Sequence, residues 1–219
     1  MKGQDILLLL KLMSLERHEK TLSGSEELEL RPLPGAWQDW EITEEEELKQ
    51  KGIIEFSEIE AYRESLYTVR NLEKTTGISK TQIADSIKRC TDIALVRKDR
   101  KYSVPRTNNK SLLEFIVYGI KYVFPVRMGE LTRGIATSFS APVLNEKLFS
   151  SGELIAVWPD ERAKSKGQKV VPLFHSVPYA VRLDGNLYEM LALVDAIRLG
   201  NQREAGLAAK MLEKMFTEI

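Results

Sequence analysis

The sequence predicts an α+β protein with two domains. Apolar residues recur at helical spacing along much of the 219 residues, which favours α-helices. Two short runs of alternating apolar residues flank a basic stretch within residues 93–104, which is typical of a β-hairpin. We therefore expect an N-terminal domain over residues 1–106, ending in that hairpin. A mainly helical C-terminal domain follows over residues 107–219, with a role in dimerisation or effector binding.

The N-terminal domain is predicted to begin with an apolar helix that is followed by an acidic insertion. Residues 5–15 are apolar nearly all round, so this helix is expected to be buried within the fold or against a second subunit. The insertion covers about residues 17–63. Residues 41–64 hold nine glutamates against three bases, and the glutamate run at 44–47 is interpreted as the solvated face and first turn of a helix, with a metal or partner site as the alternative. Capping patterns predict short helices over residues 44–51 and 58–66, after a hairpin around the sequence PLPG.

Residues 67–91 carry the most specific local pattern. Thr68 is predicted to cap a helix over residues 69–76, and Gly77 supplies the left-handed residue that ends it. Ser79 and Gln82 match a capping box, in which each side chain satisfies a backbone amide of the other. This box predicts that a second helix starts at residue 80 and runs to about residue 91.

The second helix is predicted to have one apolar face and one polar face. Ile83, Ile87 and Cys90 recur at spacings of four and three, which places them on an inward stripe. The opposite face carries long polar side chains: Lys80, Thr81, Gln82, Asp85, Lys88 and Arg89. Such a face offers donors and acceptors to base edges in a DNA major groove, with cations for the flanking phosphates.

A basic hairpin is expected directly after this helix. Residues 93–96 and 102–104 read as its strands, and its tip holds four cations, Arg97, Lys98, Arg100 and Lys101, around Asp99. The net charge of the whole chain is zero, yet residues 67–110 contain eleven bases against four acids. A local excess of this kind indicates a surface that meets phosphates. Helix, turn, helix and basic hairpin together predict a winged helix-turn-helix domain, with the hairpin as its wing.

The same segment resembles the winged helix-turn-helix of MarR-type bacterial transcription regulators. The resemblance covers about a fifth of the chain and rests on Leu72, Gly77, Ile78, Ser79, Ile83 and Ile87. Glu73 departs from it, because these families usually keep a small residue where the two helices cross. The chain also resembles a family of uncharacterised bacterial regulators with an MKGQD-type opening and an SVP motif, here Ser176 to Pro178. This second resemblance implies that residues 5–15 form the first helix of the winged fold, with residues 58–66 as the alternative.

Three further helices are expected in the C-terminal domain. A helix over residues 111–124 opens it, and an antiparallel pair over residues 187–199 and 202–216, joined at Gly200, closes it. Exposed apolar helix surface usually marks a partner. We therefore expect a homodimer, whose interface is supplied by the helix over residues 5–15 together with the closing pair or with the helix over residues 111–124.

The segment between these helices, residues 127–185, is rich in Gly, Pro and Ser. Two β-like runs are predicted within it, at 154–158 and 169–174. Residues 132–134, Thr-Arg-Gly, are interpreted as part of a solvated structural loop, with a small-anion or effector site as the alternative.

Double-stranded DNA is the predicted partner, and sequence-specific transcription regulation is the predicted function. The alternative is a protein-interaction module, an adaptor or antitoxin-like protein whose winged helix binds a protein. An effector, small molecule or protein, is left open. Catalysis is not expected, since the two histidines and the serines stand in no catalytic motif: His18, His175, Ser138, Ser140 and Ser176. No cofactor or metal is implied. The apolar run near the start is interrupted by Lys11, which together with the single cysteine favours a cytoplasmic protein without a membrane span.

Overall fold

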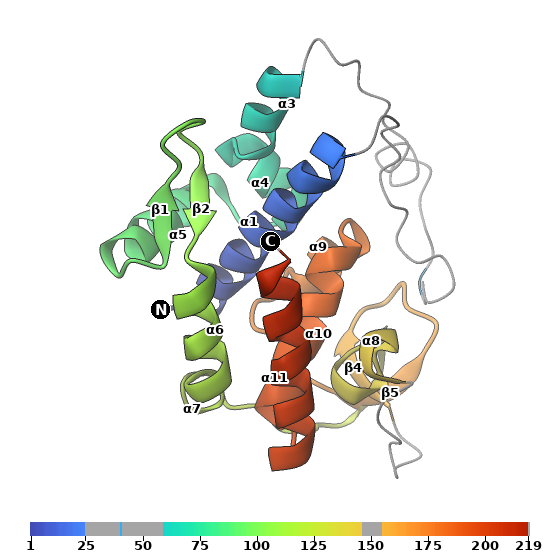
Figure 1. Ribbon diagram of the computed structural model, residues 1–219. Helices are drawn as coiled ribbons and strands as arrows, with labels where there is room; N and C mark the ends of the chain where they lie inside the picture. The colour runs from blue at the N-terminus through green and yellow to red at the C-terminus, as the bar shows by residue number, and fades with distance from the viewer. Residues whose placement is uncertain (25–39, 41–58, 146–154, 219) are drawn as a thin grey trace.

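The computed structural model describes residues 1–24, 40, 59–145 and 155–218, and shows an α+β protein (Figure 1). Its α-helices in the described ranges are α1 (Gly3–Gly24), α3 (Ile59–Leu66), α4 (Val69–Thr76), α5 (Lys80–Asp92), α6 (Asn109–Tyr118), α7 (Ile120–Val123), α8 (Pro142–Asn145), α9 (Val177–Arg182), α10 (Gly185–Leu199) and α11 (Gln202–Thr217). The strands are β1 (Val96–Lys98), β2 (Pro105–Thr107), β3 (Leu131–Ala136), β4 (Ala156–Pro159) and β5 (Lys166–Lys169). The predicted fold class, α+β, is confirmed at this level.

Most of the described helices lie where the sequence predicts them. Helix α4 has the predicted bounds, and α3, α5, α10 and α11 agree within one or two residues. The helix predicted over 111–124 is present as α6 and α7, which are separated at Gly119. Helix α1 is longer than predicted and continues to Gly24, into the segment assigned to the insertion. The predicted hairpin around PLPG and the helix over 44–51 lie outside the described residues.

The segment 127–185 contains a small sheet that the sequence analysis predicted only in part. Strand β3 pairs antiparallel with both β4 and β5, and β4 pairs parallel with β5. The prediction of a loop at 132–134 is therefore wrong, because these residues lie in β3. The run at 169–174 is not a strand either, since β5 ends at Lys169.

Two glycines within the sheet explain why the sequence does not predict its strands correctly. A Cβ at Gly134 would lie 2.0 Å from the carbonyl oxygen of Trp158, and a Cβ at Gly167 would lie 2.1 Å from that of Ile155. Both glycines thus permit a close approach between strands. A segment rich in glycine favours loops, although glycine inside a strand also marks such an approach.

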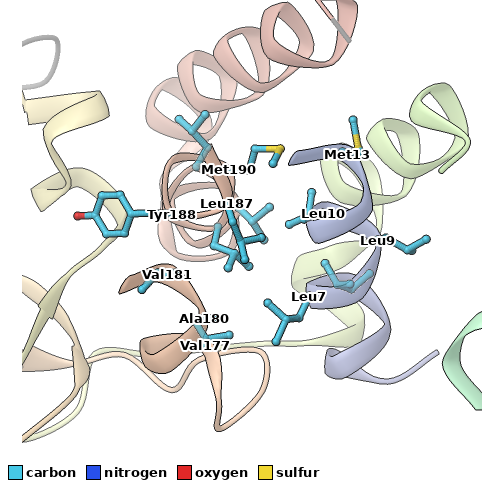
Figure 2. Packing of buried hydrophobic residues seen from close by; sticks show 14 of the residues in the cluster. Leu7, Leu9, Leu10, Met13, Val177, Ala180, Val181, Leu187, Tyr188 and Met190 are labelled. Carbon is cyan, nitrogen blue, oxygen red and sulfur yellow. The ribbon is translucent and has the colours of Figure 1, made fainter. Parts of the chain in front are cut away.

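Helix α1 is the central element of the core. It packs against α4, α5 and β2 on one side and against α10 on the other. Figure 2 shows Leu7 and Leu10 of α1 near Val177 and Ala180 of α9 and Leu187 of α10. Every residue from Asp5 to Leu15 is buried by the chain itself. The prediction that this helix supplies a dimer interface is therefore wrong, because no face of residues 5–15 is left for a second subunit.

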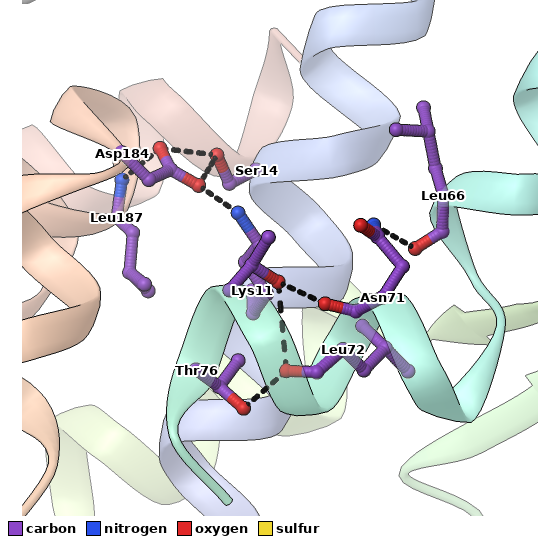
Figure 3. A network of polar contacts seen from close by, with 9 residues as sticks. Lys11, Ser14, Leu66, Asn71, Leu72, Thr76, Asp184 and Leu187 are labelled. Atoms are coloured by element: carbon purple, nitrogen blue, oxygen red, sulfur yellow. Dashed lines mark hydrogen bonds and ion pairs between the residues drawn. The ribbon is translucent and has the colours of Figure 1, made fainter. Parts of the chain in front are cut away.

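A buried ion pair connects α1 to the start of α10. The Lys11 ammonium lies 2.7 Å from the Asp184 carboxylate, and the Ser14 hydroxyl donates to the same carboxylate (Figure 3). Asp184 also accepts from the amide of Leu187 at 3.0 Å, so it caps α10. Burial raises the pKa of Asp184, but Lys11 and these hydrogen bonds outweigh burial and leave it below the ordinary value. The ionised carboxylate fixes α10 onto α1.

Candidate nucleic-acid interface

The turn between α4 and α5 has the predicted geometry. Thr68 accepts a hydrogen bond from the amide of Asn71 at 3.2 Å and so caps α4. Gly77 has φ +67°, and its amide donates to the carbonyl of Glu73. A Cβ at Gly77 would also lie 2.9 Å from the Cβ of Ser176. Glycine is needed here for both reasons, because other residues rarely adopt this φ and because α9 packs directly against the turn.

The start of α5 is held by three side chains. Ser79 and Gln82 form the predicted capping box. Glu73 accepts from the amide of Lys80 at 3.3 Å, and its other oxygen lies 3.7 Å from the Lys80 ammonium. The residue that departs from the MarR pattern thus satisfies an amide at the first turn of α5 rather than disturbing the crossing of the helices. Gln82, predicted to be exposed for base contacts, is half-buried and engaged in the cap.

The buried face of α5 differs at two positions from the predicted stripe. Ile83 and Cys90 are buried as expected, but Ser86 is buried as well and Ile87 is only partly covered. Ser86 is tolerated there because its hydroxyl accepts from Gln4 at 3.2 Å and from Arg89 at 3.0 Å. Burial raises the pKa of the Cys90 thiol to about 12, which agrees with its interpretation as a small core residue.

Arg89 does not lie as predicted. It was assigned to the DNA-facing side of α5, but its guanidinium binds the buried Asp5 carboxylate of α1 with one contact of 2.6 Å and one of 3.3 Å. The Arg89 side chain is 32% exposed, whereas that of Asp5 is 1% exposed. Burial raises the pKa of Asp5, and the bonds from Arg89 and Ser86 more than offset this, so the pKa lies below its ordinary value. Arg89 therefore fastens α5 to α1.

The face of α5 that points away from the core keeps most of the predicted polar residues. Its exposed side chains are Lys80, Thr81, Ala84, Asp85, Lys88, Thr91 and Asp92. Three of these residues can donate hydrogen bonds to a partner, and the two lysines can also form ion pairs: Lys80, Thr81 and Lys88. Ala84 leaves a gap between them, through which another surface can approach the helix backbone closely.

The predicted hairpin is present, but its strands begin later in the chain. Strands β1 and β2 pair antiparallel with Arg97 opposite Arg106. Residues 93–95 instead form the exit from α5, where Ala94 has φ +58° and the amide of Leu95 donates to the carbonyl of Cys90. Residues 102–104 belong to the loop, in which Ser103 has φ +56°. The alternation of apolar residues was correct as a sign of a hairpin and wrong as a guide to its register.

Asp99 organises the loop of this hairpin. Its carboxylate accepts from the amides of Lys101 and Tyr102 at 2.7 and 2.8 Å, and these bonds lower its pKa. Arg97 and Lys98 lie on β1, and Arg100 and Lys101 in the loop. All four predicted cations of the wing are exposed, and the Lys101 ammonium lies 4.7 Å from the Tyr102 ring centre. We refer to residues 96–107 as the basic hairpin.

Arg106 is a structural residue that the sequence analysis counted only as one more base. Its guanidinium binds Glu19 of α1 at 2.7 and 3.2 Å and also donates to the Tyr67 hydroxyl. Only 9% of the Arg106 side chain and 9% of the Glu19 side chain are exposed. The cation at the base of the hairpin is thus an anchor, which leaves the contacts to a partner to the four exposed cations.

Helix α9 holds the end of α4. The Ser176 hydroxyl donates to the carbonyl of Thr76 at 2.6 Å, and the Tyr179 hydroxyl donates to that of Lys74 at 2.7 Å. These carbonyls lie in the last turn of α4, where the helix itself offers no amide. Ser176, the first residue of the SVP sequence, therefore supports the turn before α5.

Of the remaining polar candidates, Ser140 and His175 have structural contacts, whereas the buried Ser138 hydroxyl has no hydrogen-bond partner among the described residues. The Ser140 hydroxyl accepts from the amide of Ala156, and His175 stacks beside Phe174 at 4.1 Å between ring centres. Among the residues that the structure describes, no group of three His, Cys, Asp or Glu side chains could hold a metal ion. None of the described helices has both the length and the apolar character needed to cross a membrane.

Comparison with known proteins identifies no relative. No family model matches the chain, and no curated protein and no solved structure matches it. The resemblance to MarR-type regulators therefore stays a prediction.

Proposed function

We propose that this chain is a sequence-specific regulator of transcription that binds double-stranded DNA through a winged helix-turn-helix. One observation carries the proposal: the exposed polar face of α5 and the four cations of the basic hairpin belong to neighbouring elements, which lie on the same side of the molecule in Figure 1. A helix beside a cationic hairpin suits a duplex, because the helix fits the major groove while the hairpin reaches the backbone or the minor groove.

Helix α1 serves as the first helix of this module. It packs against α4, α5 and β2, and it is joined to α5 by the Asp5 to Arg89 ion pair and to the hairpin by the Glu19 to Arg106 pair. The alternative first helix, α3, packs against α4. The segment between α1 and α3 is then an insertion between the first two helices of the module.

The exposed residues of α5 and those of the basic hairpin contact different parts of the DNA. Lys80, Thr81, Asp85 and Lys88 are the candidates for base edges, with Asp85 able to accept from a cytosine amine. Gln82 and Arg89 act through the position of α5, as do the cap residues Thr68 and Ser79. The exposed cations Arg97, Lys98, Arg100 and Lys101 contact phosphates and supply affinity without sequence preference.

Replacing Thr81 and Lys88 by Ala should reduce discrimination between DNA sequences. The reference is a duplex that the wild-type protein selects from a random pool. On this duplex we expect a loss of roughly 1–3 kcal/mol in binding free energy, while binding to scrambled DNA changes less. Fluorescence anisotropy at fixed salt measures both values. Neither side chain bonds to the core, so the variant should fold normally.

The matched control replaces Lys210 and Thr217 by Ala. Both residues are exposed on α11. It should bind both duplexes like the wild type. The proposal fails if the wild-type protein selects no sequence, or if its affinity for DNA does not depend on salt. The second result would favour a protein partner for the same surface.

We further propose that the regulator is a homodimer formed through α6 and α7. Tyr118 and Tyr122 are each 75% exposed, and Val123 beside them is 50% exposed. Glu114 and Lys121 are exposed on the same two helices, toward opposite ends. A second copy packed antiparallel would set Glu114 of each subunit near Lys121 of the other. Such a surface is self-complementary, as a two-fold interface requires.

Replacing Tyr118 and Tyr122 by Ser should convert the dimer to a monomer, because the largest apolar side chains of the interface are lost. Light scattering over a concentration series measures the mass. Ile93→Ser, at another exposed apolar position, 55% exposed and outside α6 and α7, should leave the dimer intact. Glu114→Lys should weaken it and the exchange Glu114→Lys with Lys121→Glu should restore it. A wild-type protein that is monomeric at high micromolar concentration contradicts the proposal.

A further inference from the structure

A polar hollow of about 490 Å³ lies beside β3, at the turn that joins β4 to β5. The described residues of its walls are Arg133 of β3 and four residues of the turn: Glu161, Arg162, Ala163 and Lys164. In Figure 1 these strands lie on the opposite side of the molecule from α5 and the basic hairpin. The volume is within the range of sites for small molecules. The hollow is thus separate from the candidate DNA surface.

The backbone around the hollow is held by hydrogen bonds. The amide of Asp160 donates to the carbonyl of Arg133 at 3.2 Å, and the amide of Gly134 donates to the carbonyl of Ser165 at 3.1 Å. Both ends of the turn are therefore bound to β3. Ala163, one of the lining residues, is buried and pairs with the described residue Trp40 in an antiparallel bridge. The side chains of the turn extend from a fixed frame.

Asp160 strengthens this frame from behind. One carboxylate oxygen accepts from the amide of Arg162 at 2.8 Å, and the other binds the guanidinium of Arg182, at the end of α9. Both side chains of this ion pair are 8% exposed. The negative charge of Asp160 is thus neutralised by Arg182, away from the solvent side of the hollow. A preorganised turn lowers the entropic cost of binding a ligand.

The charge of the walls defines the ligand. Among the described residues of the lining, Arg133, Arg162 and Lys164 contribute three cations and Glu161 contributes one carboxylate. Lys166 adds a fourth cation nearby, because it pairs with Arg133 across β3 and β5 and is exposed. Guanidinium groups match the paired oxygens of phosphate and carboxylate, and such charge-assisted bonds are stronger than neutral ones.

We propose that this hollow binds a small anion with at least two negative charges, of the phosphate or polycarboxylate class. Arg133 lines it from β3 and Lys164 from the turn, and the hydrogen bonds of Asp160 hold the backbone between these two elements. Glu161 opposes the anion and so sets a limit on affinity. The site does not depend on the DNA-binding proposal, although an anion bound there would be a candidate effector of the regulator.

Isothermal titration calorimetry tests the site with inorganic phosphate, citrate and glycerol. Phosphate or citrate, or both, should bind with one site per chain, and neutral glycerol should not. The difference between phosphate and citrate decides which of the two sources of negative charge the hollow accepts. Arg133→Gln and Lys164→Gln should each reduce the affinity at least about tenfold, since each removes a charge-assisted bond. Glu161→Gln should increase it.

Lys169→Ala serves as the control, because this exposed lysine is also on β5 but lies outside the lining. It should bind the anion like the wild type. Thermal unfolding without ligand confirms that the exposed substitutions leave the fold intact, and Arg133→Lys should retain more affinity than Arg133→Gln. Absence of binding for both anions overturns the proposal. Binding that persists unchanged in Arg133→Gln and Lys164→Gln also overturns it.

Discussion

Replacing Arg97, Lys98, Arg100 and Lys101 together by Ala should weaken binding to every duplex by a similar factor. These cations are exposed, so they would meet phosphates, which are the same in every sequence. Each phosphate contact releases counterions and contributes about 0.9 to the slope of log affinity against log salt. If all four contact phosphates, a fourfold rise in salt should cost the wild type roughly 100-fold more affinity than the variant.

Anisotropy titrations across a salt series, on the selected duplex and on a scrambled one, measure this effect. A pair of variants matched in charge provides the control: Arg100→Ala with Lys101→Ala, against Arg203→Ala with Lys210→Ala on α11, where both cations are exposed. Only the first pair should make the salt slope shallower. Equal slopes for the two pairs would show that the basic hairpin does not touch DNA, and would move the proposal toward a protein partner.

Arg106→Ala should lower the free energy of unfolding by about 3–5 kcal/mol, because it leaves the buried Glu19 carboxylate without its partner. The loss has a second component. Arg106 also binds the Tyr67 hydroxyl and lies over its ring at 4.9 Å, so three segments separate when it is removed: α1, the start of α4 and the basic hairpin. Urea denaturation measures the free energy.

Arg97→Ala is the natural control, since Arg97 lies directly opposite Arg106 in the hairpin and is exposed. It should change stability by less than about 0.5 kcal/mol. The double variant Arg106→Met with Glu19→Met should recover much of the loss, because neither charge is then buried alone. A cost below about 1 kcal/mol for Arg106→Ala would show that water reaches this pair, contrary to its low exposure.

The two hairpin experiments separate the contacts that bind DNA from the contacts that hold the hairpin in place. Loss of the four exposed cations should reduce DNA affinity while stability is retained. Loss of Arg106 should reduce stability first, and DNA affinity only through the orientation of the hairpin. Arginine residues ten or fewer positions apart thus have different roles, and their burial rather than their charge distinguishes them.

The sequence by itself determined the local elements of this protein. Thr68, Gly77 and the capping box of Ser79 and Gln82 predicted the ends of α4 and the start of α5, and the structure has them there. Helices α10 and α11 followed in the same way from apolar spacing and from the break at Gly200. Each of these patterns depends on residues that lie within about four positions of one another. A short segment of sequence is therefore enough to predict the element.

Tertiary structure alone decided which polar residues of the candidate site remain exposed. Arg89 faces Asp5 across 84 positions, Arg106 faces Glu19 across 87, and Ser176 reaches Thr76 across 100. No local pattern indicates such partners, because the sequence around a cationic residue on a helix is the same whether solvent or a buried carboxylate lies opposite it. The prediction that Arg89 lies on the exposed face of α5 was wrong for that reason. The strands of the hairpin were predicted too early in the chain for a related reason. The positive φ values of Ala94 and Ser103 set the register of the hairpin, and such values are unusual for these residues and are not indicated by the sequence.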